Sequence, residues 1–354
     1  MATSTPQIIG GVDTHRDLHV AAAIDPVGHL LGHRSFPATP AGYRALLAWL
    51  RGLGQLQRVG VEGTGAYGAG LLRHLRQARV TVVEVDRPDR RTRRRKGKSD
   101  PVDAEAAARA ALAGTATGIP KGRDGRVEAI RALRVARRGA MKARTAAGNQ
   151  LGCLVVSAPE PLRGTLRTLS GKELVVAAAG LRPGPDLTDA VAATKAALRR
   201  VAHRYLLLSQ EIAELDQALT VVVAKTAPRL VALLGVGTDV AGQLLVTAGD
   251  NPNRLVHEAA FAHLCGVAPL PVNSGRTTGR HRLSRGGDRA ANNALYTIVI
   301  SRLRWDPRTR AYMQRRTKQG MSKLEVVRCL KRYVAREVHQ ILTAPQPPER
   351  LDEP

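Results

Sequence analysis

The chain has 354 residues, and its 55 lysines and arginines against 29 aspartates and glutamates give a formal charge of +26. This length is too great for one small domain and fits two or three domains, each with its own core. Such an excess of positive charge is typical of a protein that binds a dense row of phosphates, so nucleic acid is the leading partner. Codon bias toward arginine is an alternative, but it would explain arginine over lysine and not base over acid.

Membrane and disulfide-rich classes are excluded by the same composition. No apolar run approaches the ~18 residues of a spanning helix, and the first five residues lack the charged and apolar regions of a signal peptide. Cys153, Cys265 and Cys329 lie far apart without a Cys-x-x-Cys pair, which supports neither a disulfide framework nor a zinc site. We therefore expect a reduced, cytoplasmic protein with no membrane partner.

The N-terminal part predicts alternating strands and helices. Three β-like runs are expected to form a meander, and proline after Thr39 indicates the start of a helix that ends near Gly52 and Gly54. The predicted order is βββαβαβ and then an alanine-rich helix. The expected strands are residues 8–12, 18–24, 30–36, 58–61 and 80–85, and the expected helices are residues 40–52, 67–78 and 101–112.

A basic segment at residues 87–98 precedes the alanine-rich helix. Like charges at this density repel and keep a segment extended until an anion neutralises them, although a solvated loop is the ordinary alternative. The candidate nucleic-acid contacts there are Arg90, Arg91, Arg93, Arg94, Arg95, Lys96 and Lys98.

The rest of the chain predicts mainly helices. Residues 126–154 and 187–225 have helical patterns with a proline-rich break between them, and 228–341 is mostly helical apart from a Gly- and Arg-rich stretch at 269–289. The spacing of Leu208, Ile212, Leu215 and Leu219 favours a helical hairpin or coiled-coil arm with a dimer contact, or else helices packed within one subunit. The proline-rich tail beyond residue 343 is expected to be disordered.

Four acidic residues are spaced as a candidate metal site. Asp13 and Glu62 end two strands that are expected to be neighbours, and Asp100 and Asp103 open the alanine-rich helix. Mg²⁺ prefers carboxylate oxygens, and two ions ~4 Å apart can stabilise both the attacking and the leaving oxygen of a phosphoryl displacement. Three to four carboxylates suit two Mg²⁺ ions, with Mn²⁺ as a substitute, so the spacing predicts phosphodiester chemistry.

Each acid also has a structural interpretation. Asp100 fits the N-cap of a helix that has proline at its first position and Asp103 in its first turn. Asp13 alone fits a turn, and Glu62 alone fits a charge at a strand end. The sequence Gly97-Lys98-Ser99 is excluded as a phosphate-binding P-loop because position 92, where the motif needs glycine, is threonine.

Several motifs resemble, in order, the insertion-sequence transposases of family 110. The N-terminal ones resemble the RuvC-like DEDD domain of that family, and the others its C-terminal domain. These motifs are Gly11-Val12-Asp13-Thr14-His15-Arg16-Asp17, Val61-Glu62-Gly63-Thr64-Gly65, Ser99-Asp100-Pro101-Val102-Asp103-Ala104, Leu234-Gly235-Val236-Gly237, Phe261-Ala262-His263-Leu264-Cys265-Gly266-Val267-Ala268-Pro269, Asn273-Ser274-Gly275 and Ser284-Arg285-Gly286-Gly287.

The resemblance implies an architecture in four parts. Residues 1–115 would form an α/β, RNase H-like (RuvC-like) catalytic domain, and 116–226 a helical coiled-coil middle. Residues 227–343 would form a mainly α C-terminal transposase domain, followed by the tail 344–354. The implied catalytic set is Asp13, Glu62, Asp100 and Asp103 as metal ligands, with Ser274 as the nucleophile.

Ser274 also has a physical argument of its own. A serine hydroxyl is a weak nucleophile that needs a base or metal to take its proton and positive charge to stabilise the transition state. Arg276, Arg280, Arg282 and Arg285 supply that charge nearby in the sequence. A plain turn is the alternative for residues 273–275, and Ser284 is the rival nucleophile in a similarly basic context.

Gly235 and Gly237 lie in a run that resembles a helix-hairpin-helix, in which glycines let backbone N–H groups approach a phosphate. A plain helical turn is the competing interpretation. The chain departs from the commoner family pattern at residues 288–293, where an Asn-Arg-Arg-Leu-Arg-like run would be usual.

The sequence is therefore interpreted as an enzyme, a DNA transposase or recombinase that excises and inserts its own element through a covalent phosphoserine intermediate. Its implied partners are donor and target DNA, an element-encoded guide RNA and further copies of itself as a dimer or tetramer. One alternative is a RuvC-like, Mg²⁺-dependent nuclease or junction resolvase that uses water as the nucleophile. Another is a non-catalytic nucleic-acid-binding protein whose acids are helix caps.

Overall fold

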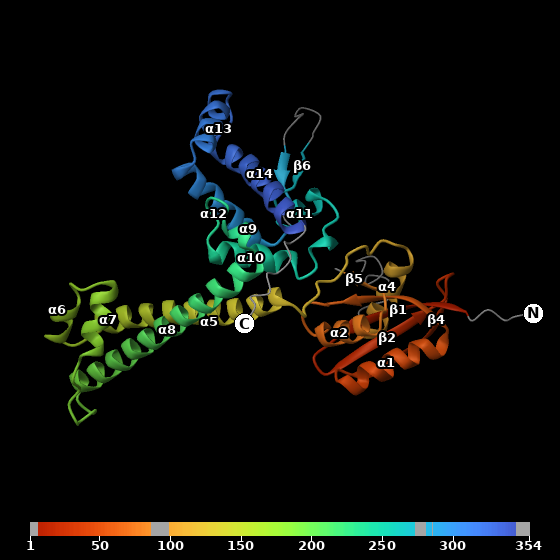
Figure 1. Cartoon of the computed structure of the whole chain (residues 1–354). Helices are drawn as coiled ribbons and strands as arrows, with labels where there is room; N and C mark the ends of the chain where they lie inside the picture. The colour runs from red at the N-terminus through yellow and green to blue at the C-terminus, as the bar shows by residue number, and fades with distance from the viewer. Residues whose placement is uncertain (1–5, 86–98, 273–280, 285, 345–354) are drawn as a thin grey trace, which may run out of the picture. The chain divides into compact units, whose positions relative to one another are not determined.

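The computed structural model describes residues 6–85, 99–272, 281–284 and 286–344 (Figure 1). The chain divides into two compact units. Unit 1 consists of residues 1–125, 248–264 and 342–354, and unit 2 consists of residues 126–247 and 265–341. The domain boundaries expected from sequence, near residues 115, 226 and 343, stay predictions. The candidate contacts from Arg90 to Lys98 and the proline-rich tail lie outside the described residues.

Unit 1 is built on a five-stranded sheet in the order β3-β2-β1-β4-β5. Strands β1, β2 and β3 are antiparallel neighbours, which confirms the predicted meander, whereas β1–β4 and β4–β5 are parallel pairs. The carboxyl ends of β1 and β4 therefore meet at one edge of the sheet. The strands are β1 Gln7–Thr14, β2 Leu18–Ile24, β3 Leu30–Pro37, β4 Gln55–Glu62 and β5 Val82–Val85.

Helices pack on both faces of this sheet. Helices α1 (Pro40–Leu53) and α2 (Ala69–Gln77) cover one face, where Val12, Leu50 and Leu72 belong to the same buried cluster. Helix α4 (Asp100–Leu112) covers the other face and buries small side chains such as Ala108 against β1, β2 and β4. The short elements η1 (Pro252–Arg254) and α11 (Glu258–Leu264) also belong to unit 1.

Local signals fix the starts of these helices. Thr39 caps α1 as its sequence indicates, because its Oγ1 accepts a hydrogen bond from the Gly42 N–H at 3.2 Å. Asp100 does not cap α4, contrary to the capping interpretation. The N-cap is Ser99 and Asp100 is the first helical residue, so its carboxylate is free to point toward the strands.

Unit 2 contains two long helices that pack side by side, α5 (Arg126–Val156) and α8 (Ala190–Thr226) (Figure 1). The short helices α6 (Leu162–Leu166) and α7 (Gly171–Ala179) lie at one end of the pair and share its buried cluster, with Leu151 and Leu198. This packing bears out the predicted pair of helices within one subunit. The coiled-coil and dimer interpretation stays a prediction.

The rest of unit 2 is mostly helical. One correction to the sequence analysis concerns the Gly- and Arg-rich stretch, because strands β6 and β7 pair there as an antiparallel two-stranded sheet. The remaining elements are α9 Pro228–Val231, α10 Thr238–Ala248, β6 Pro269–Pro271, β7 His281–Leu283, α12 Arg289–Trp305, α13 Pro307–Lys318 and α14 Lys323–Thr343. Within the described ranges, every helix is too short or too polar to cross a membrane.

Candidate metal centre and nucleic-acid contacts

Two glycines explain how α4 comes close to the strands that carry the acids. A Cβ atom on Gly11 would lie 2.2 Å from the backbone oxygen of Ala104, and one on Gly60 would lie 2.4 Å from that of Ala107. Both glycines therefore face α4. Since alternate residues of a strand face the same side, the residues two positions further on, Asp13 and Glu62, also face α4.

The register of the sheet brings these two acids to the same edge. Val12 pairs with Val61 across the parallel β1–β4 ladder, so Asp13 and Glu62 follow at neighbouring strand ends. The Thr14 hydroxyl donates a hydrogen bond of 2.8 Å to the Glu62 carbonyl and ties these ends together. The predicted convergence of Asp13 and Glu62 from adjacent strands agrees with this geometry.

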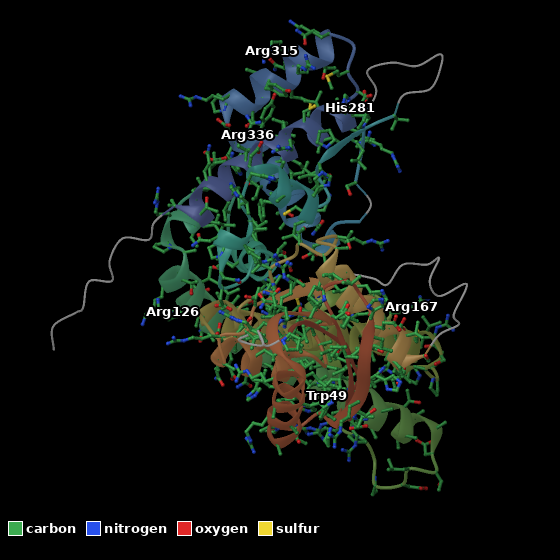
Figure 2. The ribbon with its side chains drawn as sticks, turned by 90° about the vertical axis from the view of Figure 1, so that its right-hand side faces the viewer. Trp49, Arg126, Arg167, His281, Arg315 and Arg336 are labelled. Atoms are coloured by element: carbon green, nitrogen blue, oxygen red, sulfur yellow. The ribbon has the colours of Figure 1, made fainter. Side chains whose placement is uncertain are left out.

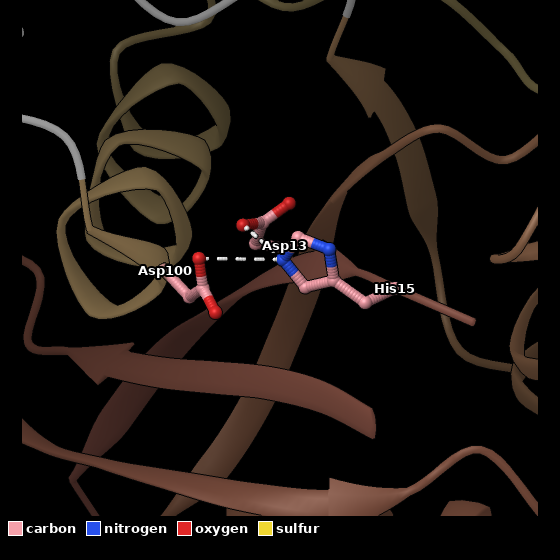
Figure 3. Close-up of side chains that lie close together, drawn as sticks. All are labelled: Asp13, His15 and Asp100. Carbon is pink, nitrogen blue, oxygen red and sulfur yellow. Dashed lines mark hydrogen bonds and ion pairs between the residues drawn. The ribbon is translucent and has the colours of Figure 1, made fainter. Parts of the chain in front are cut away.

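His15 lies between Asp13 and Asp100. Its Nε2 is 3.1 Å from Asp13 Oδ2 and 3.4 Å from Asp100 Oδ1, as the dashed lines in Figure 3 mark. One ligand atom from each of the three side chains lies within 4.8 Å of the others. Strand β1 and the first turn of α4 thus present two carboxylates and an imidazole to a common point.

Asp13 is the buried member of this cluster, whereas His15 and Asp100 are exposed. The Asp13 side chain is 11% exposed. Burial raises the pKa of its carboxyl, as do the charges of Asp103 and Asp100, whereas His15 lowers it. Asp103 is also buried, one turn into α4. A buried carboxylate beside two others is stabilised by a cation, and the oxygen and imidazole donors suit a divalent metal ion. The side chains of Asp13, His15, Asp100 and Asp103 are therefore suitable ligands for the divalent metal ion that the sequence predicts.

The turn after Glu62 is held by a contact that sequence reasoning missed. Thr64 is buried, and its hydroxyl donates a short hydrogen bond to Glu84 Oε1 on β5. Gly63 has a φ of +74°, a conformation that favours glycine. In Glu62-Gly63-Thr64-Gly65, glycine therefore permits the turn and threonine anchors it, which fixes the direction in which Glu62 leaves the sheet.

His15 is a second residue of the site that was not predicted from the sequence. The sequence feature that could have indicated His15 is its position two residues after Asp13. In an extended chain alternate side chains lie on the same side, so His15 is expected on the side of Asp13. Only the position of Asp100, which is distant in the sequence, shows that His15 meets a second carboxylate.

The serine half of the expected site lies mainly outside the described residues. The predicted residues outside the described ranges are Ser274, Arg276, Arg280 and Arg285. Arg282 lies on β7 with an exposed side chain. The rival serine, Ser284, lines a pocket of about 430 Å³ with Arg289 and Lys331, so its surroundings are basic, as its sequence context indicates.

Lys331 is the most buried cation of that pocket. Its side chain is 8% exposed, and burial lowers the pKa of its amine, with a contribution from Arg328. Its Nζ donates to Asn292 Oδ1 at 2.8 Å, and the Asn292 amide donates to the carbonyls of Cys265 and Gly266. Asn292, in the segment that departs from the family pattern, thereby anchors the chain that enters β6.

Gly235 and Gly237 lie between α9 and α10. Gly235 has a φ of +85°, and a Cβ there would lie 3.1 Å from the Ile298 carbonyl, so glycine is required for the turn and its packing. Gly237 has open space around its Cα. The four-residue helix α9, this turn and α10 follow one another, and phosphate contact at the two glycines stays a prediction.

The fold and the candidate metal site together are typical of one class of catalytic domain. A mixed sheet covered by helices on both faces, with carboxylates at neighbouring strand ends and on a following helix, is the RNase H-like arrangement of a DEDD domain. Such a domain implies the use of a divalent metal.

Comparison with known proteins identifies the family. Residues 10–158 match the DEDD family model described as Transposase, and residues 227–314 match the one described as Transposase IS116/IS110/IS902 family. The chain belongs to the IS110 family of transposases. The resemblance drawn from the motifs is thereby confirmed.

Two curated relatives come from insertion elements. The uncharacterized 42 kDa protein of insertion element IS900 from Mycobacterium paratuberculosis is 26% identical over 152 residues, which cover 42% of this chain and 37% of that protein. The uncharacterized 43.6 kDa protein of insertion element IS110 from Streptomyces coelicolor is 32% identical over 96 residues, which cover 27% of this chain and 23% of that protein. The chain thus matches little more than a third, or less, of the length of these relatives.

Proposed function

We propose that this protein is a DNA transposase that excises and inserts its own element by phosphoryl transfer. The observation that supports this most directly is the placement of Asp13 and Glu62 on the α4 face of neighbouring strand ends, together with the acids of α4. Family membership makes DNA the expected substrate. The charge of +26 agrees with a polyanionic partner.

In this proposal Asp13, Glu62, Asp100 and Asp103 hold divalent metal, with Mg²⁺ in two positions and Mn²⁺ as a substitute. Bound metal would stabilise the charge that develops on the phosphate and its attacking and leaving oxygens. Asp13 and Asp103 supply buried carboxylates, and His15 orients Asp13 and Asp100 through the contacts at 3.1 and 3.4 Å. The hydrogen bonds of Thr14 and Thr64 hold the Glu62 end of β4 in place.

The nucleophile in this proposal is the hydroxyl of Ser274. Its oxygen would form a bond to a DNA phosphorus as a DNA oxygen leaves, and the covalent phosphoserine would conserve the phosphodiester energy for rejoining without ATP. Arg276, Arg280, Arg282 and Arg285 would stabilise the charge on the phosphate. Ser284, which lies beside a buried lysine and an arginine, is the competing serine.

Two further parts of the proposal concern partners. An element-encoded guide RNA would pair with donor and target DNA, and the protein would act as a dimer or tetramer, with the α5–α8 pair as the candidate contact. The basic charge of the chain attracts RNA and DNA alike. Sequencing the RNA that copurifies with the protein separates a single guide species from a random population, which would contradict guidance.

The test of the catalytic proposal is a strand-exchange assay on element-end DNA with Mg²⁺. Asp13→Asn and Glu62→Gln remove metal-binding charge, so we expect exchange to fall at least 100-fold, in the range of the loss of one electrostatic contact at an active site. Ser274→Ala should abolish both exchange and the covalent protein–DNA adduct seen on denaturing gels. Ser284→Ala is the matched control and should retain the adduct.

Each alternative function predicts a different result in the strand-exchange assay. A nuclease that uses water would still cut DNA after Ser274→Ala and form no adduct in the unmodified protein. A non-catalytic binding protein would be indifferent to Asp13→Asn, Glu62→Gln and Mg²⁺. Loss of the adduct in Ser284→Ala alone would move the nucleophile to that serine.

A further inference from the structure

A second, larger pocket in unit 2 lies between the β6–β7 hairpin and the C-terminal helices. Its volume is about 660 Å³, within the usual range of small-molecule sites. Figure 2 labels His281 on β7, which lines this pocket, and Arg315 on α13, the neighbour in sequence of the lining residue Arg316. The wall of α14 contributes Arg328, Cys329, Arg332 and Tyr333.

The charges at this pocket are predominantly positive. Among the described residues that line it, four are arginines, namely Arg282, Arg316, Arg328 and Arg332, and one, Glu325, carries a carboxylate. Glu325 accepts hydrogen bonds from the N–H and hydroxyl of Ser322 at 2.9 and 2.7 Å, so this carboxylate serves the start of its own helix. The pocket therefore presents an excess of donors to an anion.

One donor of an arginine that lines the pocket has no hydrogen-bond partner within the described part of the chain. The Nε of Arg316 is buried without a hydrogen-bond partner among the described residues, while its Nη1 donates to Gln319 at 2.7 Å. A buried donor left unmatched costs free energy. The guanidinium that carries it lines the pocket, and guanidinium groups are good partners for phosphate oxygens.

The pocket is also lined by apolar residues and one aromatic residue. Val267, Val272 and Met321 line it together with Tyr333, whose side chain is 51% exposed. The Tyr333 ring is held edge-on by Tyr312 at 5.7 Å between centroids. Aromatic residues make up only 3% of the chain, so an exposed tyrosine fixed beside four arginines is unusual here. A fixed ring face is the platform on which nucleobases stack.

We propose that this pocket receives one unpaired nucleotide of the bound nucleic acid, with its base on Tyr333 and its phosphates among the four arginines. The inference rests on the nucleic-acid binding in the proposed function, and it adds a contact with a single unstacked base. Paired DNA keeps its base faces stacked inside the duplex, so it cannot use Tyr333 in this way, whereas a bulged or single-stranded nucleotide can.

The test compares two oligonucleotides with the full chain by fluorescence anisotropy. One is a fully paired duplex, and the other has the same sequence with a single unpaired 2-aminopurine, each made as DNA and as RNA. Tyr333→Ala should weaken binding of the bulged form about 5- to 150-fold, the range for loss of one base–aromatic stack. Binding of the paired duplex should stay within about twofold of the unmodified protein. The 2-aminopurine emission should be quenched by the unmodified protein and not by this variant.

Two further variants serve as controls. Tyr333→Phe keeps the ring and should retain both affinity and quenching. Trp305→Ala removes an aromatic side chain that is 64% exposed outside the pocket, and it should change neither. Melting temperatures of all variants, measured in parallel, identify any loss caused by unfolding, and Arg328→Gln then provides a second variant of the pocket.

The outcomes separate this inference from the proposed function. If Tyr333→Ala weakened binding of the paired and bulged substrates equally, or weakened neither, the proposed nucleotide pocket would be wrong. That result would not bear on the proposed metal site at Asp13, Glu62, Asp100 and Asp103. Failure of the unmodified protein to bind either substrate would count against nucleic-acid binding as a whole. The arm that responds, DNA or RNA, identifies the strand that supplies the nucleotide.

Discussion

His19 is a buried imidazole at the start of β2 with neither ring nitrogen hydrogen-bonded within the described residues. Its ring stacks on Tyr43 at 5.6 Å with an interplanar angle of 9°. Burial lowers the pKa of His19 below its usual 6.5, and the charge of His15 lowers it further, while the Leu18 backbone raises it. The folded protein therefore favours the neutral form of His19 more than the unfolded chain does.

This pKa shift predicts a pH-dependent stability. In the unfolded chain His19 binds a proton near its usual pKa, so below about pH 6.5 the unfolded state binds more protons than the folded state. Stability should fall as the pH drops through 6.5. Urea unfolding at pH 7.5 and 5.5 should show a smaller loss for His19→Phe, which keeps the stack on Tyr43, than for the unmodified protein. His33→Phe, at an exposed position on β3, is the control and should lose as much stability between the two pH values as the unmodified protein. Equal losses of stability in the unmodified protein and in both variants would show that His19 is not the cause of the pH dependence.

At the scale of elements, the approach of α4 to the sheet decides the metal site. The acids on the strands and on the helix meet because glycine at positions 11 and 60 leaves room for the backbone of α4. The alanines of α4 complete this fit, since Ala104, Ala107 and Ala108 are buried against the strands. The motif Gly-Val-Asp/Glu thus combines close approach, core packing and a ligand in three consecutive residues.

Gly60→Ala tests this directly. The added methyl would lie 2.4 Å from the Ala107 carbonyl, so α4 must shift, at a cost of about 1–3 kcal/mol. We expect lower stability in urea unfolding and weaker Mn²⁺ binding in calorimetry, because Asp100 and Asp103 move with the helix. Gly52→Ala is the matched control, since a Cβ there meets no atom within 4 Å and the residue is helical. It should be neutral or stabilise by about 0.5–1 kcal/mol.

Across the whole molecule, electrostatics governs the binding of nucleic acid. Each phosphate neutralised by lysine or arginine releases counterions, so affinity falls steeply with salt. If the +26 chain contacts 6–10 phosphates, raising salt from 50 to 200 mM should weaken duplex binding about 10³- to 10⁵-fold. Anisotropy titrations at constant Mg²⁺ measure this slope. A slope near zero would mean that the arginines serve the fold alone, as codon bias would predict.

Much of the fold could be predicted from local patterns. The meander, the start of α1 and the long helices α5 and α8 follow from alternation, capping and helical spacing, which act over a few residues. The β6–β7 pair was missed because its strands have three residues each and the first and last residues of β6 are prolines. Strands this short carry no periodicity to detect.

The sequence by itself determined which acids stand at strand ends and which open a helix, because chain direction and alternation are local properties. It also determined the family through motifs in fixed order. Only the tertiary structure decided that His15 joins Asp13 to Asp100, that Thr64 anchors to Glu84, and that Tyr333 of α14 and Arg316 of α13 line one pocket. These contacts join residues from different elements, and their geometry depends on packing that no short stretch of sequence encodes.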